Sequence, residues 1–103
     1  MAELKLKEII NFNDTGFVEG KKLQTILEDY LSKNISAEID LEGVRFLSSS
    51  FFNGAIGELV LKYPIDYLRN NLHFINISNG DKHLLSKSIS LAKKFKENKI
   101  QLK

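Results

Sequence analysis

Three consecutive serines, Ser48 to Ser50, are the side chains in this sequence best placed for chemistry. They lie within the segment IDLEGVRFLSSSFFNGAIGEL, residues 39–59. Its beginning alternates apolar and polar residues as a strand does, and its end has apolar residues at helical spacing. The first amides of a helix point outward at the positive end of its dipole. A phosphate on Ser49 or Ser50 would be accommodated there, so a phosphorylation switch is one hypothesis.

A plainer interpretation is purely structural: Ser50 caps the helix, and Ser48 and Ser49 belong to the preceding loop. Under the switch hypothesis, Ser49 and Ser50 are sites of phosphorylation or partner contact. In open α/β sheets, ligands and partners commonly bind at such a strand end. The predicted partner surface therefore extends over the neighbouring positions Leu47, Ser48, Phe51, Asn53 and Gly54.

Catalytic interpretations have less support. Ser49, His73, His83 and Asp40 supply the residue types of a hydrolase triad, but no nucleophile-elbow motif surrounds the serine. We therefore predict a protein that is not an enzyme and has no catalytic residues. The sequence has no cysteine, no paired-histidine motif and no calcium-loop motif, so we expect no metal site and no cofactor.

Two further motifs have structural explanations. Gly54 and Gly57 superficially resemble a phosphate loop, but they lie inside a helical pattern, where close packing of the helix on a sheet explains them better. The lysine-rich end from Lys93 to Lys103 could contact phosphates of a nucleic acid. It has few aromatic residues and contains Glu97, so a solvated helix end is the better interpretation.

Composition indicates a folded, single-domain protein. The 103 residues are 43% hydrophobic and 27% charged, with a net charge of only +2, so no strong electrostatic field predicts nucleic-acid binding. We expect one domain over residues 1–103, with a frayed tail from about 97 to 103. The absence of cysteine, of a signal-like start and of a long apolar run leads us to expect a cytoplasmic protein that does not bind membranes.

Hydrophobic periodicity predicts strand, helix, strand, helix, strand and helix in turn. This order predicts an α/β fold with a small mixed or mainly parallel sheet covered by helices. A turn is expected from Asn11 to Gly16, one extra helical turn between Pro64 and Asn71, and a capping box formed by Ser78 and Asp81. The predicted strands are 3–10, 35–41 and 72–77, and the predicted helices are 20–32, 49–63 and a third that starts after Ser78.

The segment 39–59, the helix around GKKLQTIL and the LHFINIS strand together resemble the STAS-like domains of unknown function, which are related to bacterial anti-sigma factor antagonists. The resemblance implies a β-α-β-α-β-α fold and a regulatory role in a bacterial or phage signalling system. In the antagonists, a serine at the place of Ser49 is phosphorylated by a partner kinase. Ser48 and Phe51 stand here where the antagonists have an acid and a glycine.

The resemblance also implies the kind of partner. It points to another protein, such as a histidine-kinase-like ATPase or an anti-sigma-type regulator, and leaves a homo-oligomer open. Because STAS relatives have been linked to nucleotides, the alternative is a domain that binds a nucleotide or phosphate ligand through the same helix amides.

Overall fold

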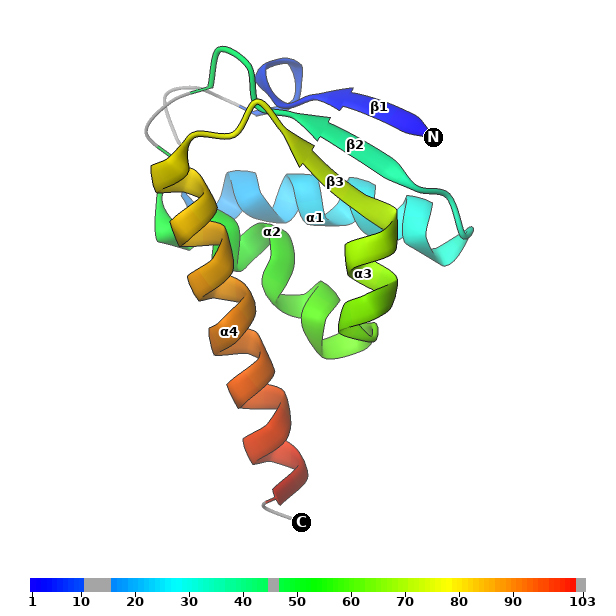
Figure 1. The fold of residues 1–103 in the computed structure, drawn as a ribbon, viewed down its shortest axis with the longest axis vertical. Helices are drawn as coiled ribbons and strands as arrows, with labels where there is room; N and C mark the ends of the chain where they lie inside the picture. Colours follow the sequence, from blue (N-terminus) through cyan, green and yellow to red (C-terminus); the bar gives the residue numbers. More distant parts are fainter. Residues whose placement is uncertain (11–15, 45–46, 102–103) are drawn as a thin grey trace.

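The computed structural model describes residues 1–10, 16–44 and 47–101, with side chains as far as Glu97. Three strands lie side by side at one end of the molecule, and the helices lie below them (Figure 1). Of the turn predicted from Asn11 to Gly16, residues 11–15 lie outside the described residues. The elements are β1 Ala2–Lys5, the 3-10 helix η1 Leu6–Glu8, α1 Phe17–Ser32, β2 Ala37–Asp40, α2 Ser49–Lys62, α3 Ile65–Asn71, β3 Leu72–Ile75 and α4 Asn79–Gln101.

The sheet is parallel throughout its described strands. Its order is β1-β2-β3, with Leu4 opposite Ile39 and Ile39 opposite Phe74. Of the two predicted arrangements, the mixed sheet is therefore wrong and the mainly parallel sheet is confirmed for the described strands. The α/β class holds, but the element order contains an additional short helix, α3, where the sequence predicted a single helical turn.

The helices cover only one face of this sheet. Parallel crossovers are almost always right-handed, so strands added in a single direction receive their connecting helices on the same side. On the inner face, Ile39 is buried in the core, whereas the outward-facing His73 is exposed. The mostly apolar sequence of residues 72–77 predicts a strand covered on both sides, but no helix of the described chain lies over the outer face.

The strand β2 ends in a tight turn fixed by its own last residue. The Oδ1 atom of Asp40 accepts hydrogen bonds from the amide of Glu42 at 2.9 Å and from the side-chain nitrogen of Asn76 at 2.9 Å. The amide of Val44 donates to the carbonyl oxygen of Leu41 at 3.0 Å, and Gly43 has a φ of 79°, a conformation that favours glycine. The sequence Asp-Leu-Glu-Gly-Val, residues 40–44, thus forms the turn that ends β2.

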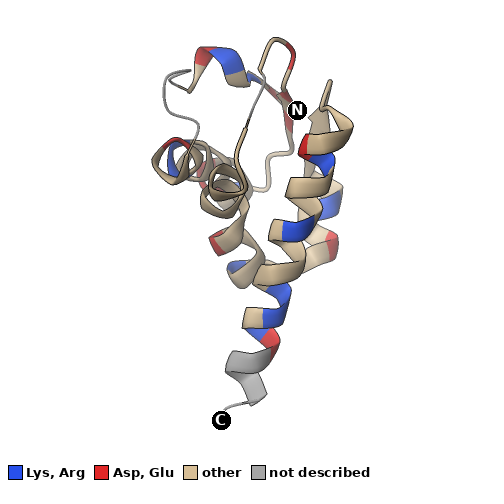
Figure 2. Cartoon of the chain, turned by 90° about the vertical axis from the view of Figure 1, so that its left-hand side faces the viewer, with Lys and Arg blue, Asp and Glu red and all other residues tan. Residues whose placement is uncertain are grey.

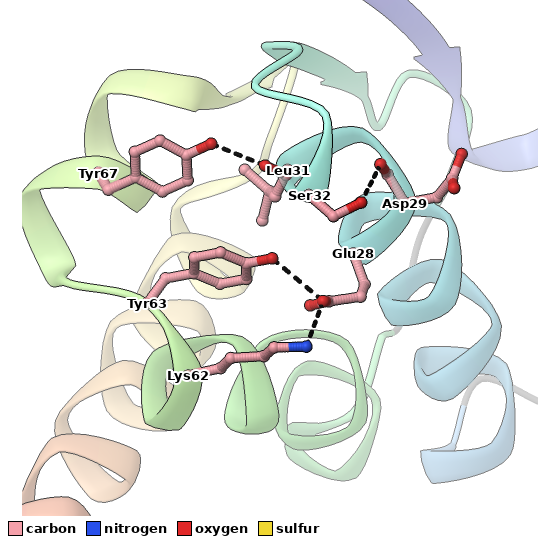
Figure 3. Close-up of polar contacts among 7 residues, drawn as sticks. All are labelled: Glu28, Asp29, Leu31, Ser32, Lys62, Tyr63 and Tyr67. Atoms are coloured by element: carbon pink, nitrogen blue, oxygen red, sulfur yellow. Dashed lines mark hydrogen bonds and ion pairs between the residues drawn. The ribbon is translucent and has the colours of Figure 1, made fainter.

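A polar cluster joins α1 to the end of α2, as Figure 3 shows. The carboxylate of Glu28 lies 2.6 Å from Nζ of Lys62 and accepts a hydrogen bond from the hydroxyl of Tyr63 at 3.0 Å. One turn further along α1, the carbonyl oxygen of Leu31 accepts a hydrogen bond from the hydroxyl of Tyr67 in α3 at 2.7 Å. The helical periodicity of residues 20–32 predicts a solvated position for Glu28, but its side chain contacts Lys62 and Tyr63 at the end of α2.

The last helix, α4, packs along α2 and extends beyond the rest of the molecule (Figure 1). It begins as predicted, because Oγ of Ser78 accepts a hydrogen bond from the amide of Asp81 at 3.1 Å. Ser88 is buried. Phe95 follows it by seven residues, a helical spacing that predicts a buried position, but Phe95 is 59% exposed. None of the helices within the described part of the chain is long and apolar enough to span a membrane.

Candidate functional site

The serine run lies at the carboxyl end of the sheet, where α2 begins. Oγ of Ser48 accepts a hydrogen bond from the amide of Phe51 at 3.1 Å, so Ser48 is the helix cap. The structural interpretation had given this role to Ser50. Both Ser49 and Ser50 are exposed in the first turn of α2, where a modifying enzyme or a partner can reach them.

Much of the predicted partner surface is instead core. Leu47 is buried, the Phe51 ring is wholly buried edge-on against Phe52, and Gly54 is buried against α1. Leu47 and Phe51 therefore cannot contact a partner without unfolding, whereas Gly54 also lines an open groove beside α4. The periodicity of α2 turns them inward, because positions 47, 51 and 54 follow at four- and three-residue steps. Ser48 is half-buried, and Asn53 is exposed beside Ser49 and Ser50.

The residue types of a hydrolase triad are not brought together. Asp40 is engaged by Glu42 and Asn76, and its hydrogen bonds hold its pKa below the ordinary value of 3.8, chiefly through Asn76. His73 is exposed on the outer face of the sheet and His83 on α4. In the described chain, no hydrogen bond joins Ser49 to either histidine.

A groove runs between α2 and α4, beginning at the first residue of α1. This surface, the α2–α4 groove, has a volume of about 350 Å³. Phe17, Leu91 and Phe95 line it and are 53%, 60% and 59% exposed. Large apolar side chains that gather in one concave surface and remain in water are the usual mark of an interaction site.

The floor of the groove is polar at one point and open at another. Oγ of Ser88 donates a hydrogen bond to Oδ1 of Asn53 at 2.6 Å, which joins α4 to α2. Gly57 also lines the groove, and a side chain at this position would meet no atom within 4 Å of its Cβ. Gly54 and Gly57, which resemble a phosphate loop, therefore have two different structural roles. Gly54 packs against α1, and not against the sheet as predicted. Gly57 leaves the groove open.

The serines and the groove share one stripe of α2. Residues at four-residue steps lie above one another on a helix, so Ser49, Asn53, Gly57 and Leu61 form a single row. Asn53, Gly57 and Leu61 line the groove. The exposed hydroxyl of Ser49 consequently stands one turn beyond its end.

The described residues contain no cluster of histidine, aspartate and glutamate that could hold a metal ion. The sheet also offers no ligand crevice of the doubly wound type. Such a crevice forms where neighbouring connections leave a sheet on opposite sides. Here the order β1-β2-β3 advances in one direction.

Fold and site together define a small parallel α/β domain with an exposed apolar groove beside a serine-bearing helix start. The sequence profile of the family described as STAS-like domain of unknown function (DUF4325) matches residues 19–82, which is more than half of the chain. The chain therefore belongs to this family. No curated protein and no solved structure matches the chain.

The family match ends before the α4 wall of the groove, which contains Leu91 and Phe95. Sequence reasoning missed the groove because apolar residues of a helix were assigned to the core. One signal was available: Leu91 lies seven residues after Leu84 and four before Phe95, at the edge of the apolar stripe of its helix. An isolated Leu on a surface is ordinary, and only its proximity to Phe17 makes it informative.

Proposed function

We propose that this protein is a non-enzymatic regulatory module of a bacterial or phage signalling system, which acts in the cytoplasm by binding another protein. The α2–α4 groove and the start of α2 form the binding surface. The observation that carries the proposal is the gathering of exposed Phe17, Leu91 and Phe95 in one groove. Aromatic residues such as Phe are enriched in the cores of protein interfaces, where a few buried anchors supply most of the binding energy.

The serine switch is part of this proposal. A phosphate on Ser49 adds nearly two negative charges at the end of the row that lines the groove. Partner affinity would change because the added charge alters both the field and the hydration of that surface. Ser50 is the second candidate. The family resemblance supports a histidine-kinase-like ATPase or an anti-sigma-type regulator as the partner.

The arrangement of the polar groups supports binding over catalysis. Asp40 is committed to a turn, and the two histidines lie on α4 and on the outer face of the sheet. The nucleotide-binding alternative gains no specific support from the order of the described strands, β1-β2-β3, which has no reversal of direction of the kind that opens a ligand crevice in doubly wound sheets.

Site-specific photo-crosslinking in the native host cell tests the docking surface. A photoreactive amino acid replaces Leu91 or Ser50 in one set of variants and Glu38 or His73, on the outer face of the sheet, in a control set. We expect the first set to capture one and the same protein and the control set to capture none. Equal capture from both faces, or no capture from the groove, would refute the proposal.

The switch has a separate test. Phosphosite mapping should find phosphate on Ser49 or Ser50, and Ser49→Asp or Ser50→Asp should change the affinity for the captured partner severalfold relative to the matched alanine variants. Unaltered binding by both aspartate variants removes the switch and leaves the docking surface in place. Saturable binding of a nucleoside triphosphate, with no protein captured, would favour the alternative function.

A further inference from the structure

The α4 wall of the groove passes directly into a strip of positive charge. Lys87 and Lys94 stand four residues before and three residues after Leu91, so all three share one side of the helix. A shallow hollow next to the groove is lined by these three residues together with His83. Among residues 1–10, 16–44 and 47–97, no acidic side chain forms an ion pair with Lys87 or Lys94. Figure 2 shows lysines along the length of this helix.

The opposite wall carries no excess charge. Nζ of Lys21 lies 2.8 Å from Oε1 of Glu58, so these two charges in the groove lining balance each other. The described rim therefore has a net positive charge that comes from α4. A molecule bound in the groove would bind more tightly if it carried acidic groups on the side that faces Lys87 and Lys94.

The shape of the groove indicates a helix as its occupant. Its α2 side extends from Asn53 to Leu61, which is about 12 Å or two helical turns. Two parallel walls of this length hold the apolar face of a helix through residues spaced three and four apart. A membrane surface fits less well, because the apolar groups line a concavity. A second copy bound through the same surface would bring the lysines of the two chains together.

We infer that the groove binds an amphipathic helix of the partner protein whose apolar residues are flanked by Asp or Glu facing Lys87 and Lys94. This inference rests on the proposed function and specifies its partner. The apolar residues fill the groove between Gly57 and Leu91. The acidic residues form ion pairs with Lys87 and Lys94. Because these pairs are exposed to solvent, the affinity falls as the salt concentration rises.

Two synthetic peptides test the inference with the intact 103-residue chain. Each has about 14 residues, or four helical turns, with Leu and Phe at helical spacing. One carries Glu on both flanks of the apolar face, and the other carries Lys at the same positions. Fluorescence anisotropy should show roughly tenfold tighter binding of the Glu peptide, which two exposed ion pairs can supply.

A pair of matched variants assigns this preference to the rim. Lys87→Glu with Lys94→Glu should reverse the preference, so that the Lys peptide binds more tightly. The control is Lys82→Glu with Lys93→Glu, which changes the net charge of the same helix equally. Lys93 lines a hollow with Val60 and Ile65 away from the groove, and Lys82 precedes it by three turns on that side. The control should keep the preference of the native protein.

A third variant blocks the groove without disturbing the fold. Gly57→Leu places a side chain where no atom lies within 4 Å of the new Cβ, and Leu favours a helix over Gly. It should reduce binding of the Glu peptide at least tenfold, whereas Gly57→Ala should reduce it less. Circular dichroism confirms that both variants are folded.

Four outcomes would overturn the inference. They are equal binding of the two peptides, equal effects of the two double variants, groove-dependent binding to phosphatidylserine vesicles in place of the peptides, and a dimer that Gly57→Leu dissociates. The proposed function has its own readout in the crosslinking experiment. A captured partner with no peptide preference refutes only the acidic helix, whereas failure of groove crosslinking refutes the proposed function itself.

Discussion

Gly20 and Gly54 face each other where α1 packs against α2. A Cβ on Gly54 would lie 2.5 Å from the carbonyl oxygen of Phe17, and a Cβ on Gly20 would collide with the carbonyl oxygen of Phe51. The two backbones are therefore in direct contact at this point, which only glycine permits. This contact also places Phe17 at the end of the α2–α4 groove.

The first prediction concerns this contact. Gly20→Ala and Gly54→Ala should each lower the free energy of unfolding by about 1–3 kcal/mol, because the added methyl meets main-chain atoms that cannot move aside. Gly57→Ala is the control. It should leave stability unchanged or raise it by up to about 1 kcal/mol, because Ala favours a helix over Gly. Urea denaturation measures all three, and equal costs would contradict the packing described here.

The second prediction separates the cap from the switch. Ser48→Ala removes the acceptor of the Phe51 amide and should lower the free energy of unfolding by about 1 kcal/mol. Ser49→Ala removes an exposed hydroxyl and should change it by less than about 0.5 kcal/mol. Thermal and urea unfolding measure the difference. The assignment of the cap fails if the Ser49 variant proves the less stable one.

The third prediction concerns the pKa of Asp40 and stability at low pH. The hydrogen bond from Asn76 is the main cause of the lowered pKa of Asp40, and the amide of Glu42 contributes. A lowered folded-state pKa stabilises the fold above the ordinary value of 3.8, and this contribution is lost as pH falls through the folded-state pKa. Asn76→Gly, which tolerates the positive φ of 55°, should raise the pKa of Asp40 toward 3.8.

Carboxyl carbon chemical shifts, followed by NMR through the acid range, measure this pKa directly. Asn71→Gly is the control and should leave the pKa of Asp40 unchanged. The Asn71 side chain forms hydrogen bonds with the carbonyl oxygen of Tyr67 and the hydroxyl of Ser36, and not with Asp40. An Asp40 titration that is identical in the native protein and in Asn76→Gly would show that Asn76 does not set it.

The fourth prediction concerns the pKa values of Lys62 and Tyr63 and stability at high pH. Glu28 raises the pKa of Lys62 above 10.5 through its hydrogen bond and its charge. Burial raises the pKa of Tyr63 above 10.0, and Glu28 adds to that effect. Raised folded-state pKa values stabilise the fold below the unfolded-state values, and this contribution is lost as pH rises through the folded-state values.

Glu28→Gln should therefore lower the pKa of Tyr63, which phenolate absorbance reports, and reduce the alkaline loss of stability. Asp29→Asn is the matched control, because Asp29 pairs with Lys33 on the exposed side of the same helix. A Tyr63 titration that responds equally to both variants would contradict the contact shown in Figure 3.

The sequence alone determined the features that depend on local spacing. Leu23, Leu27 and Leu31 recur at four-residue steps, which predicts one buried stripe, and all three are buried on α1. The hydroxyl of Ser78 caps α4, and α2 begins at Ser49. The motifs around residues 39–59 were enough to identify the STAS-like family, which the profile match confirms.

Only the tertiary structure decided which polar and apolar faces meet. Periodicity shows that a helix has an apolar stripe, but not whether a neighbour covers all of it. Phe95 is exposed because it lines the open groove between α4 and α2, whereas Glu28 contacts Lys62 from another helix. Whether the sheet is covered depends on the direction in which successive strands are added, which is a long-range choice that no local pattern encodes.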